Sequence, residues 1–169
     1  MWVVIAMFSL FSIETLSFNF SLTVQPPLKE FPFKVGSDIF INPMNNDKTI
    51  EILIRVNFQH IKGGIIFLDS AIKFTYSLEK EVPDLFNDRH MIQLDEKILQ
   101  ALLLRTYYTF RGLTAAKMQD TALKSLFLPD VDGETLVKWY KNTHKVFYKE
   151  FKKQFKKILS NMEDEESEE

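Results

Sequence analysis

Apolar and polar residues alternate with a period of two over the first half of the chain, which is typical of half-buried strands. The first such segment carries its apolar side chains at Phe18, Phe20, Leu22 and Val24, and Pro26-Pro27 ends it because proline offers no ladder donor. Segments 34–42, 48–60 and 65–78 are the other predicted strands. Gly63-Gly64 favours a tight hairpin between the last two, because glycine adopts positive φ at little cost. The pattern predicts an antiparallel meander.

From Leu94 the apolar spacing changes to that of a helix, which we expect to run to about Met118. Apolar residues lie on several faces of this helix, so more than one side must be covered. In a small domain that indicates an oligomer interface. After an extended link that ends at Pro129, Asp130 or Asp132 caps a second helix, from about Glu134 to Ser160. The predicted fold class is α+β: a four-stranded antiparallel sheet followed by two helices, the second long and basic.

The composition narrows the class of protein. The 169 residues include 16 phenylalanines against 5 tyrosines and 2 tryptophans, an unusual surplus of one aromatic residue. There is no cysteine, which excludes disulfide scaffolds, thiol nucleophiles and thiolate zinc sites. The absence also fits a reducing compartment, so we expect a cytoplasmic protein.

The two ends of the chain differ from the middle. Residues 1–12 form an apolar lead-in, which we interpret as leading into the first strand. The alternative is a signal peptide or anchor, but no basic residue precedes the run and no small-x-small cleavage site follows it. Residues 163–169 carry six acids and no bases, which predicts a disordered acidic tail over 161–169. The domain then spans 13–160. Its small excess of basic residues is weak support for nucleic-acid binding, and we expect no such partner.

One segment suggests an enzyme. Residues 126–135 place an apolar run before Asp130 and Asp132, which resembles the nucleophile and acid pair of haloacid-dehalogenase-type phosphotransferases. Pro129 would break the buried strand that must present such a pair, and too few residues follow to complete the site. The helix-cap interpretation is therefore favoured. The histidines at 60, 90 and 144 have no partner at metal-ligand spacing. We expect no catalytic residue, metal or cofactor.

Two features favour binding over catalysis. Phe31-Pro32-Phe33 lies in a connection between strands, where turns are normally polar, and exposed phenylalanine lowers solubility unless it is covered or used. The alternative is a loop packed on its own core. The second helix has an aromatic face and many lysines, so it could also act as a membrane-surface or partner-binding adaptor. Packing of its aromatic face on the sheet is the simpler interpretation.

The order of these elements resembles that of the SecB family of export chaperones, including the SecB-like members associated with toxin–antitoxin systems. The resemblance covers residues 13–150. Its most specific parts are Arg111-Gly112 at the end of the first helix and Leu128-Pro129 in the link. The first strand, 18–22, and Gly64 to Phe67 also agree. The lysine-rich end of the second helix and the apolar N-terminus depart from the family, as does the modest net charge of −2, which puts docking to the export motor in doubt.

The resemblance implies an ATP-independent holdase that keeps unfolded clients in aromatic grooves and forms a dimer or tetramer through its first helices. The client would be an exported protein, an antitoxin or another specialised partner. The implied client contacts are Leu28, Phe31, Phe33, Leu136, Trp139, Tyr140 and Phe147. The implied oligomer interface comprises Leu94, Ile98, Leu102, Arg105 and Tyr108. Membrane contact is not favoured.

Overall fold

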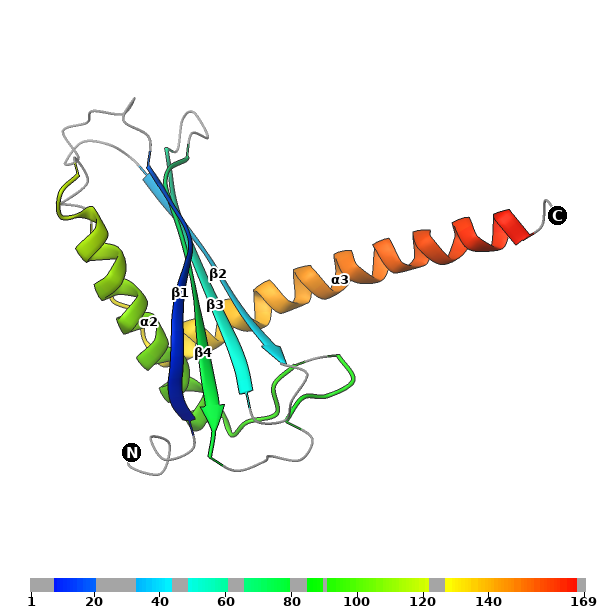
Figure 1. The fold of residues 1–169 in the computed structure, drawn as a ribbon, viewed down its shortest axis with the longest axis horizontal. Coiled ribbons are helices and arrows are strands. Elements are labelled where there is room, and N and C mark those ends of the chain that lie inside the picture. Colours follow the sequence, from blue (N-terminus) through cyan, green and yellow to red (C-terminus); the bar gives the residue numbers. More distant parts are fainter. Residues whose placement is uncertain are drawn as a thin grey trace.

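A computed structural model describes residues 8–20, 33–43, 49–60, 66–79, 85–89, 91–121 and 127–166, with only the backbone for residues 33, 43, 60 and 151–166. It contains a four-stranded antiparallel sheet followed by two helices, which confirms the α+β prediction (Figure 1). The elements are β1 (Phe8–Phe20), β2 (Phe33–Pro43), β3 (Thr49–His60), β4 (Ile66–Leu78), α2 (Glu96–Met118) and α3 (Gly133–Glu166).

The strand order is β1-β4-β3-β2. Strands β2, β3 and β4 form the predicted meander, but β1 pairs with β4, so the prediction of a continuous meander was wrong. Short connections force consecutive strands to pair, whereas residues 21–32 are long enough to let β1 pair elsewhere. As a result β1 and β2, which are neighbours in sequence, are the two edges of the sheet.

Strand β1 begins at Phe8, inside the segment that we assigned to a lead-in. Its alternation is hard to detect in the sequence, because the register with β4 shifts between Leu10 and Ser12 and again between Thr15 and Ser17. Phe11 and Leu16 lie at these two shifts, and both are exposed. The predicted continuation through 21–24 lies outside the described residues.

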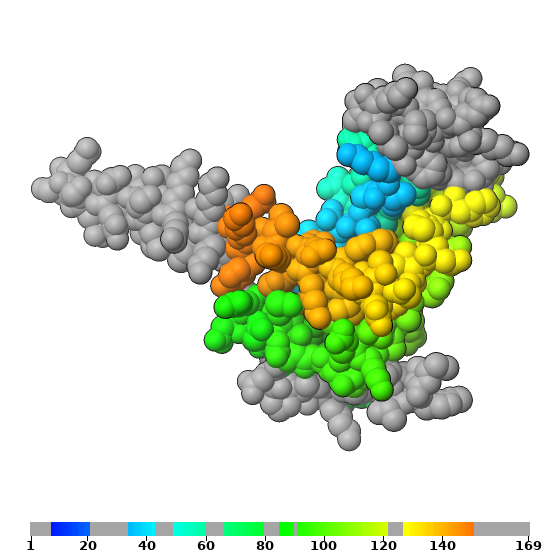
Figure 2. Space-filling model, turned by 180° about the vertical axis from the view of Figure 1, so that it is seen from behind, coloured from blue at the N-terminus to red at the C-terminus, as the bar shows by residue number. Residues whose placement is uncertain are grey.

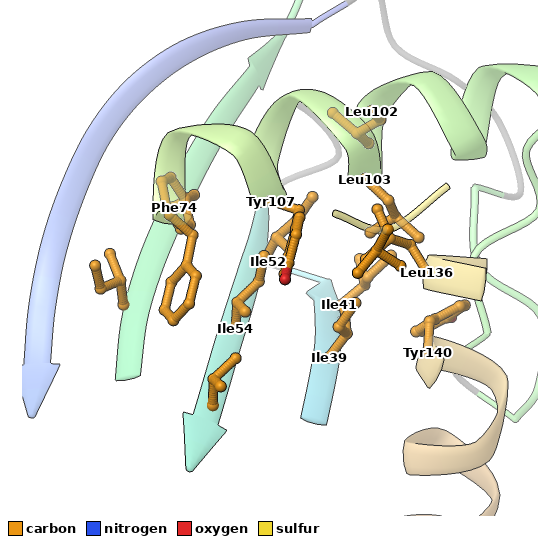
Figure 3. Packing of buried hydrophobic residues seen from close by; sticks show 14 of the residues in the cluster. Ile39, Ile41, Ile52, Ile54, Phe74, Leu102, Leu103, Tyr107, Leu136 and Tyr140 are labelled. Carbon is orange, nitrogen blue, oxygen red and sulfur yellow. The ribbon is translucent and has the colours of Figure 1, made fainter. Parts of the chain in front are cut away.

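The core lies between one face of the sheet and the two helices. The five apolar side chains that β3 was predicted to bury are at most 2% exposed: Ile50, Ile52, Ile54, Val56 and Phe58. Figure 3 shows Leu103 and Tyr107 of α2 near the isoleucines of β2 and β3. The Tyr76 hydroxyl lies 2.8 Å from that of Thr106. Because Thr106 donates to the Leu102 carbonyl, Tyr76 is the donor in this pair.

The other face of the sheet is more polar and carries ion pairs between neighbouring strands. The Lys73 ammonium lies 2.8 Å from the Glu14 carboxylate and 3.3 Å from that of Glu51. These two contacts raise the pKa of Lys73. Arg55 and Asp69 form a second pair at 2.7 Å. Since this face is polar and the opposite face is buried, the main contact of the sheet with the helices is on the buried face.

Side-chain caps begin both helices. Asp95 accepts a hydrogen bond from the Lys97 amide at 2.9 Å at the start of α2, and Asp132 accepts one from the Thr135 amide at 2.7 Å at the start of α3. The hydrogen bond from Thr135 lowers the pKa of Asp132. Asp130 pairs with Arg111 instead. Of the two predicted caps, Asp132 is therefore the one that α3 uses.

The first turns of α3 pack closely on α2. A Cβ added at Gly133 would lie 2.9 Å from the Cβ of Gln100, so only glycine fits this position without a shift.

Beyond the sheet α3 continues away from the body of the protein (Figure 1). The helix extends to Glu166, six residues past its predicted end at Ser160. Glutamate favours helices, which lets an acidic tail extend one. Within the described residues, no helix is long and apolar enough to span a membrane.

Candidate binding cleft

A cleft with a volume of about 350 Å³ lies between edge strand β2 and helix α3. Figure 2 shows the orange part of α3 leaving the body of the protein beside the light-blue β2. The cleft is lined by Ser37, Asp38 and Phe40 of β2 and by Trp139, Asn142, Thr143, Val146, Phe147 and Glu150 of α3. The residues from α3 recur at spacings of three and four, so they form one stripe along the helix. One strand and one helix face therefore build the whole site.

The walls of the cleft are aromatic. The Phe40 and Phe147 rings meet edge to face, with centroids 5.8 Å apart and an interplanar angle of 81°. Trp139 is half-buried and meets Tyr107 edge to face, with centroids 6.1 Å apart. Phe147 is 55% exposed and Val146 is 59% exposed. Apolar side chains held open to solvent in a cleft are available to bind an apolar partner.

Thr143 fixes α3 to the sheet edge at the floor of the cleft. Its hydroxyl accepts a hydrogen bond from the Ile39 amide at 3.4 Å and donates to the Asp38 carboxylate at 3.5 Å. Tyr140, one turn earlier in α3, accepts a hydrogen bond from the Ile92 amide at 3.0 Å. Burial raises the pKa of Tyr140. The two Thr143 bonds hold the helix against β2, and the Tyr140 bond ties it to the segment before α2.

The charges around the cleft are segregated. Among the described residues, the charged side chains that line it are two carboxylates, Asp38 and Glu150. Four lysines of α3 are exposed, and none of them lines the cleft: Lys138, Lys141, Lys145 and Lys149. The cleft is thus acidic on a helix that is otherwise basic, which favours a partner that has cationic as well as apolar groups.

Some of the predicted client contacts line the cleft, and others are buried below it. Trp139 and Phe147 line the cleft. Leu136 is 0% exposed and Tyr140 is 1% exposed, so in this structure both pack in the core below the cleft, and their contact with a client stays a prediction (Figure 3). Helical periodicity identifies an apolar face but not which of its turns the sheet covers.

Part of the predicted site lies outside the described residues. This is true of Leu28 and Phe31, and of the Phe33 side chain, although the backbone of Phe33 begins β2. Sequence reasoning missed Phe40 and Val146, which line the cleft. Phe40 alternates with the buried Ile39 and Ile41 in a predicted strand, so its position on the opposite face could have been found from the period of two.

The residues of the predicted oligomer interface also fall into an accessible group and a buried one. Tyr108 is 49% exposed and Arg105 is exposed, while Leu94 and Ile98 are half-buried. These four side chains are accessible on the surface. Leu102 is 2% exposed and packs inside the chain. The interface itself stays a prediction.

The described residues contain no group of three or more potential metal ligands. Asp130 and Asp132 are occupied by Arg111 and by the start of α3. The Tyr107 hydroxyl donates to the Pro129 carbonyl at 2.9 Å, and burial raises the pKa of Tyr107 to about 12. Both carboxylates of the segment that resembles a phosphotransferase motif are thus engaged in contacts at the link between α2 and α3.

The fold is similar to that of the Mycobacterium tuberculosis SecB-like chaperone Rv1957, solved in complex with a ChAD peptide from the Rv1956 HigA1 antitoxin. The match covers 77% of this chain and 95% of that one, with a TM-score of 0.53 and 10% sequence identity. A protein of unknown function from Streptococcus agalactiae matches over 74% of this chain and 94% of its own, at 12% identity. Its TM-score of 0.29 is too low to indicate a shared fold. No protein-family model and no curated protein matches the sequence. The chain has the fold of SecB-like chaperones.

Proposed function

We propose that this protein is an ATP-independent holdase that binds non-native polypeptide in the cleft between β2 and α3. The observation that supports this most directly is the exposure of Phe147 and Val146 beside Phe40 in a preformed cleft. Rigid aromatic surfaces bind varied apolar segments because they lose little side-chain entropy on contact. Binding of this kind requires no catalytic group.

The cleft favours a particular kind of client segment. An aromatic or large aliphatic side chain would pack between Trp139 and the Phe40–Phe147 pair. A lysine or arginine nearby in the client would lie close to Asp38 or Glu150. Complementary charge of this kind contributes mainly to specificity and to the rate of association. Leu28, Phe31 and Phe33 stay predicted client contacts.

The SecB-like neighbour holds an antitoxin peptide, which supports a client of that type for this chain. A single specialised client, such as an antitoxin, suits this protein better than the export motor, because the chain lacks the strong negative charge of general export chaperones. The absence of cysteine supports a role in the cytoplasm.

We also propose that the protein acts as a homo-oligomer. Edge strand β1 has four exposed apolar side chains along its length, Phe11, Ile13, Leu16 and Phe20, and Tyr108 of α2 is half-exposed. An exposed apolar edge strand promotes association, because its backbone groups are open to pairing. Native mass spectrometry tests this directly, and a monomer at micromolar concentration would contradict it.

The second candidate function is a membrane-surface adaptor. It is favoured by the exposure of Lys138, Lys141, Lys145 and Lys149 on a helix that projects from the body. Sedimentation with anionic vesicles tests it, since surface binding through lysines weakens as salt rises. Absence of vesicle binding at low salt would remove this candidate.

The holdase proposal is tested by suppression of aggregation of denatured citrate synthase diluted into buffer. Phe147→Ser should weaken suppression several-fold, because it removes a cleft wall that the core does not need. Phe127→Ser is the matched control: Phe127 is 73% exposed and does not line the cleft. Equal suppression by the two variants would contradict the assignment of the cleft.

A further inference from the structure

The hydrogen bond between Ile39 and Thr143 fixes the direction of the backbone groups along β2. The Ile39 amide donates to a side chain on α3, so it points away from β3. In an antiparallel pair, successive residues point their N–H and C=O groups alternately toward and away from the partner strand. The backbone groups of Val35 and Ser37 therefore point outward as well, while those of Gly36 point toward β3.

Pro43 supports this assignment independently. It lies in β2 opposite Ile50. Pro43 is four residues after Ile39, so the backbone groups of the two residues point to the same side of the strand. Proline has no N–H, so in a sheet it is tolerated where that group would otherwise point away from the neighbouring strand. The sequence of β2 is thus consistent with an outward direction at every second residue from Val35 to Pro43.

Helix α3 covers only part of this edge. It satisfies the Ile39 amide, but no described residue outside the sheet hydrogen-bonds to the backbone of Val35 or Ser37. The Val35 side chain is 36% exposed. Ser37 also lines the aromatic cleft, so the open backbone edge and the cleft are continuous. An unpaired edge beside an apolar cleft is the arrangement used for recognition by strand addition.

We propose that an extended segment of non-native polypeptide adds to β2 as a further strand, pairing with Val35 and Ser37, and places alternate side chains in the cleft. This inference rests on the proposed function and specifies how the client is held. Unfolded clients differ in side chains but share backbone N–H and C=O groups, so pairing with the strand supplies affinity without requiring a sequence. The cleft and its carboxylates, Asp38 and Glu150, then select neutral or basic apolar segments.

The test uses a proline that removes a single outward donor. Val35→Pro deletes the amide that points to solvent and keeps the ladder to β3. Val35→Ala is the matched control, because it shortens the side chain and keeps the amide. The probe is a fluorescein-labelled synthetic peptide of alternating phenylalanine, serine and lysine. We expect Val35→Ala to bind within about twofold of the wild type and Val35→Pro to bind about fivefold to tenfold more weakly.

Two further measurements do not depend on the folding of the proline variant. The same peptide, N-methylated on one edge of its backbone, should bind the unaltered protein at least about fivefold more weakly than the parent peptide. Hydrogen exchange at the Val35 and Ser37 amides should slow when the parent peptide is added, and exchange at Ala115 on α2 should not change.

The outcomes separate this inference from the proposed function. Equal affinity for the parent and methylated peptides, with no protection of Val35 and Ser37, would overturn strand addition even if Phe147→Ser weakens binding. Protection of these amides that rises with protein concentration and without peptide would assign the edge to a second copy of the chain, and would also overturn it. No binding of any peptide by the wild type would refute the proposed function itself.

Discussion

Thr143 on α3 accepts a hydrogen bond from the backbone amide of Ile39 on β2, across 104 positions of sequence, at a donor–acceptor distance of 3.4 Å. This contact joins the last helix to the edge of the sheet. It satisfies a buried edge amide that would otherwise lack a partner and sets the separation of the walls of the cleft. The geometry of the candidate site thus depends on a hydrogen bond at the floor of the cleft.

We therefore predict that Thr143→Val lowers the free energy of unfolding by about 1–2 kcal/mol, because the Ile39 amide loses its acceptor in a buried position. The shape of the side chain is preserved, so packing changes little. Urea denaturation measures the effect. Thr109→Val is the control, since the Thr109 hydroxyl bonds only to the Arg105 carbonyl in its own helix. A loss no larger than that of the control would contradict a structural role for the Thr143 contact.

The buried pair of Tyr76 and Thr106 should couple the sheet to α2. Tyr76→Phe and Thr106→Val each remove one side of the 2.8 Å hydrogen bond, and each should cost about 1–3 kcal/mol. The double variant should lose less free energy of unfolding than the sum of the two single losses, by about 0.5–1.5 kcal/mol. The second substitution no longer leaves a buried polar group without its hydrogen-bond partner. Equilibrium unfolding of the four proteins in a double-mutant cycle gives the difference. Strict additivity would show that the pair does not interact.

The two aspartates of the link should differ in their effect. Asp132→Ala removes the cap of α3 and should lower the melting temperature by about 2–4 °C. Asp130→Ala breaks a surface ion pair with Arg111 and should lower the melting temperature by less. Thermal unfolding followed by circular dichroism compares them. Magnesium-dependent phosphatase activity that disappears with Asp130→Asn would instead support the phosphotransferase interpretation.

Stability should fall in alkaline solution because of the buried tyrosines. Burial raises the pKa of Tyr107 from 10.0 to about 12, so the folded state keeps a proton that the unfolded state releases. The unfolded state binds fewer protons over this range, and the free energy of unfolding therefore stays level below about pH 10 and decreases between about pH 10 and pH 12. Urea denaturation across this range should show a shallower decrease for Tyr107→Phe. An identical decrease in both proteins would contradict the assignment.

The sequence predicted the fold well where the local pattern was strong. The period of two gave the bounds of β2, β3 and β4 within about a residue, and the helical period gave the extent of α2. The pairing of β1 with β4 could not be predicted, because hydrophobic periodicity carries no information on which edge a strand joins. The two register shifts in β1 also interrupt its apolar–polar alternation, so the sequence did not reveal the first residues of the strand.

The site was harder to predict, for a different physical reason. Leu136, Tyr140 and Phe147 share one apolar stripe of α3, yet the first two are buried and the third is exposed. What separates them is the point at which the helix passes the edge of the sheet, and this depends on tertiary contacts such as that of Thr143. Phe40 joins the cleft for the same reason: β2 is an edge strand, and α3 crosses it.

The central claim is that non-native polypeptide binds in the cleft between β2 and α3. The most direct test is photo-crosslinking to reduced, carboxymethylated lactalbumin, with a benzoylphenylalanine replacing Phe147 in one protein and Phe127 in another. Both positions are exposed, and only the first lies in the cleft. We predict strong crosslinking from position 147 that excess unlabelled client suppresses, and little from position 127. Equal yields from the two positions, or crosslinking from position 127 alone, would contradict the account.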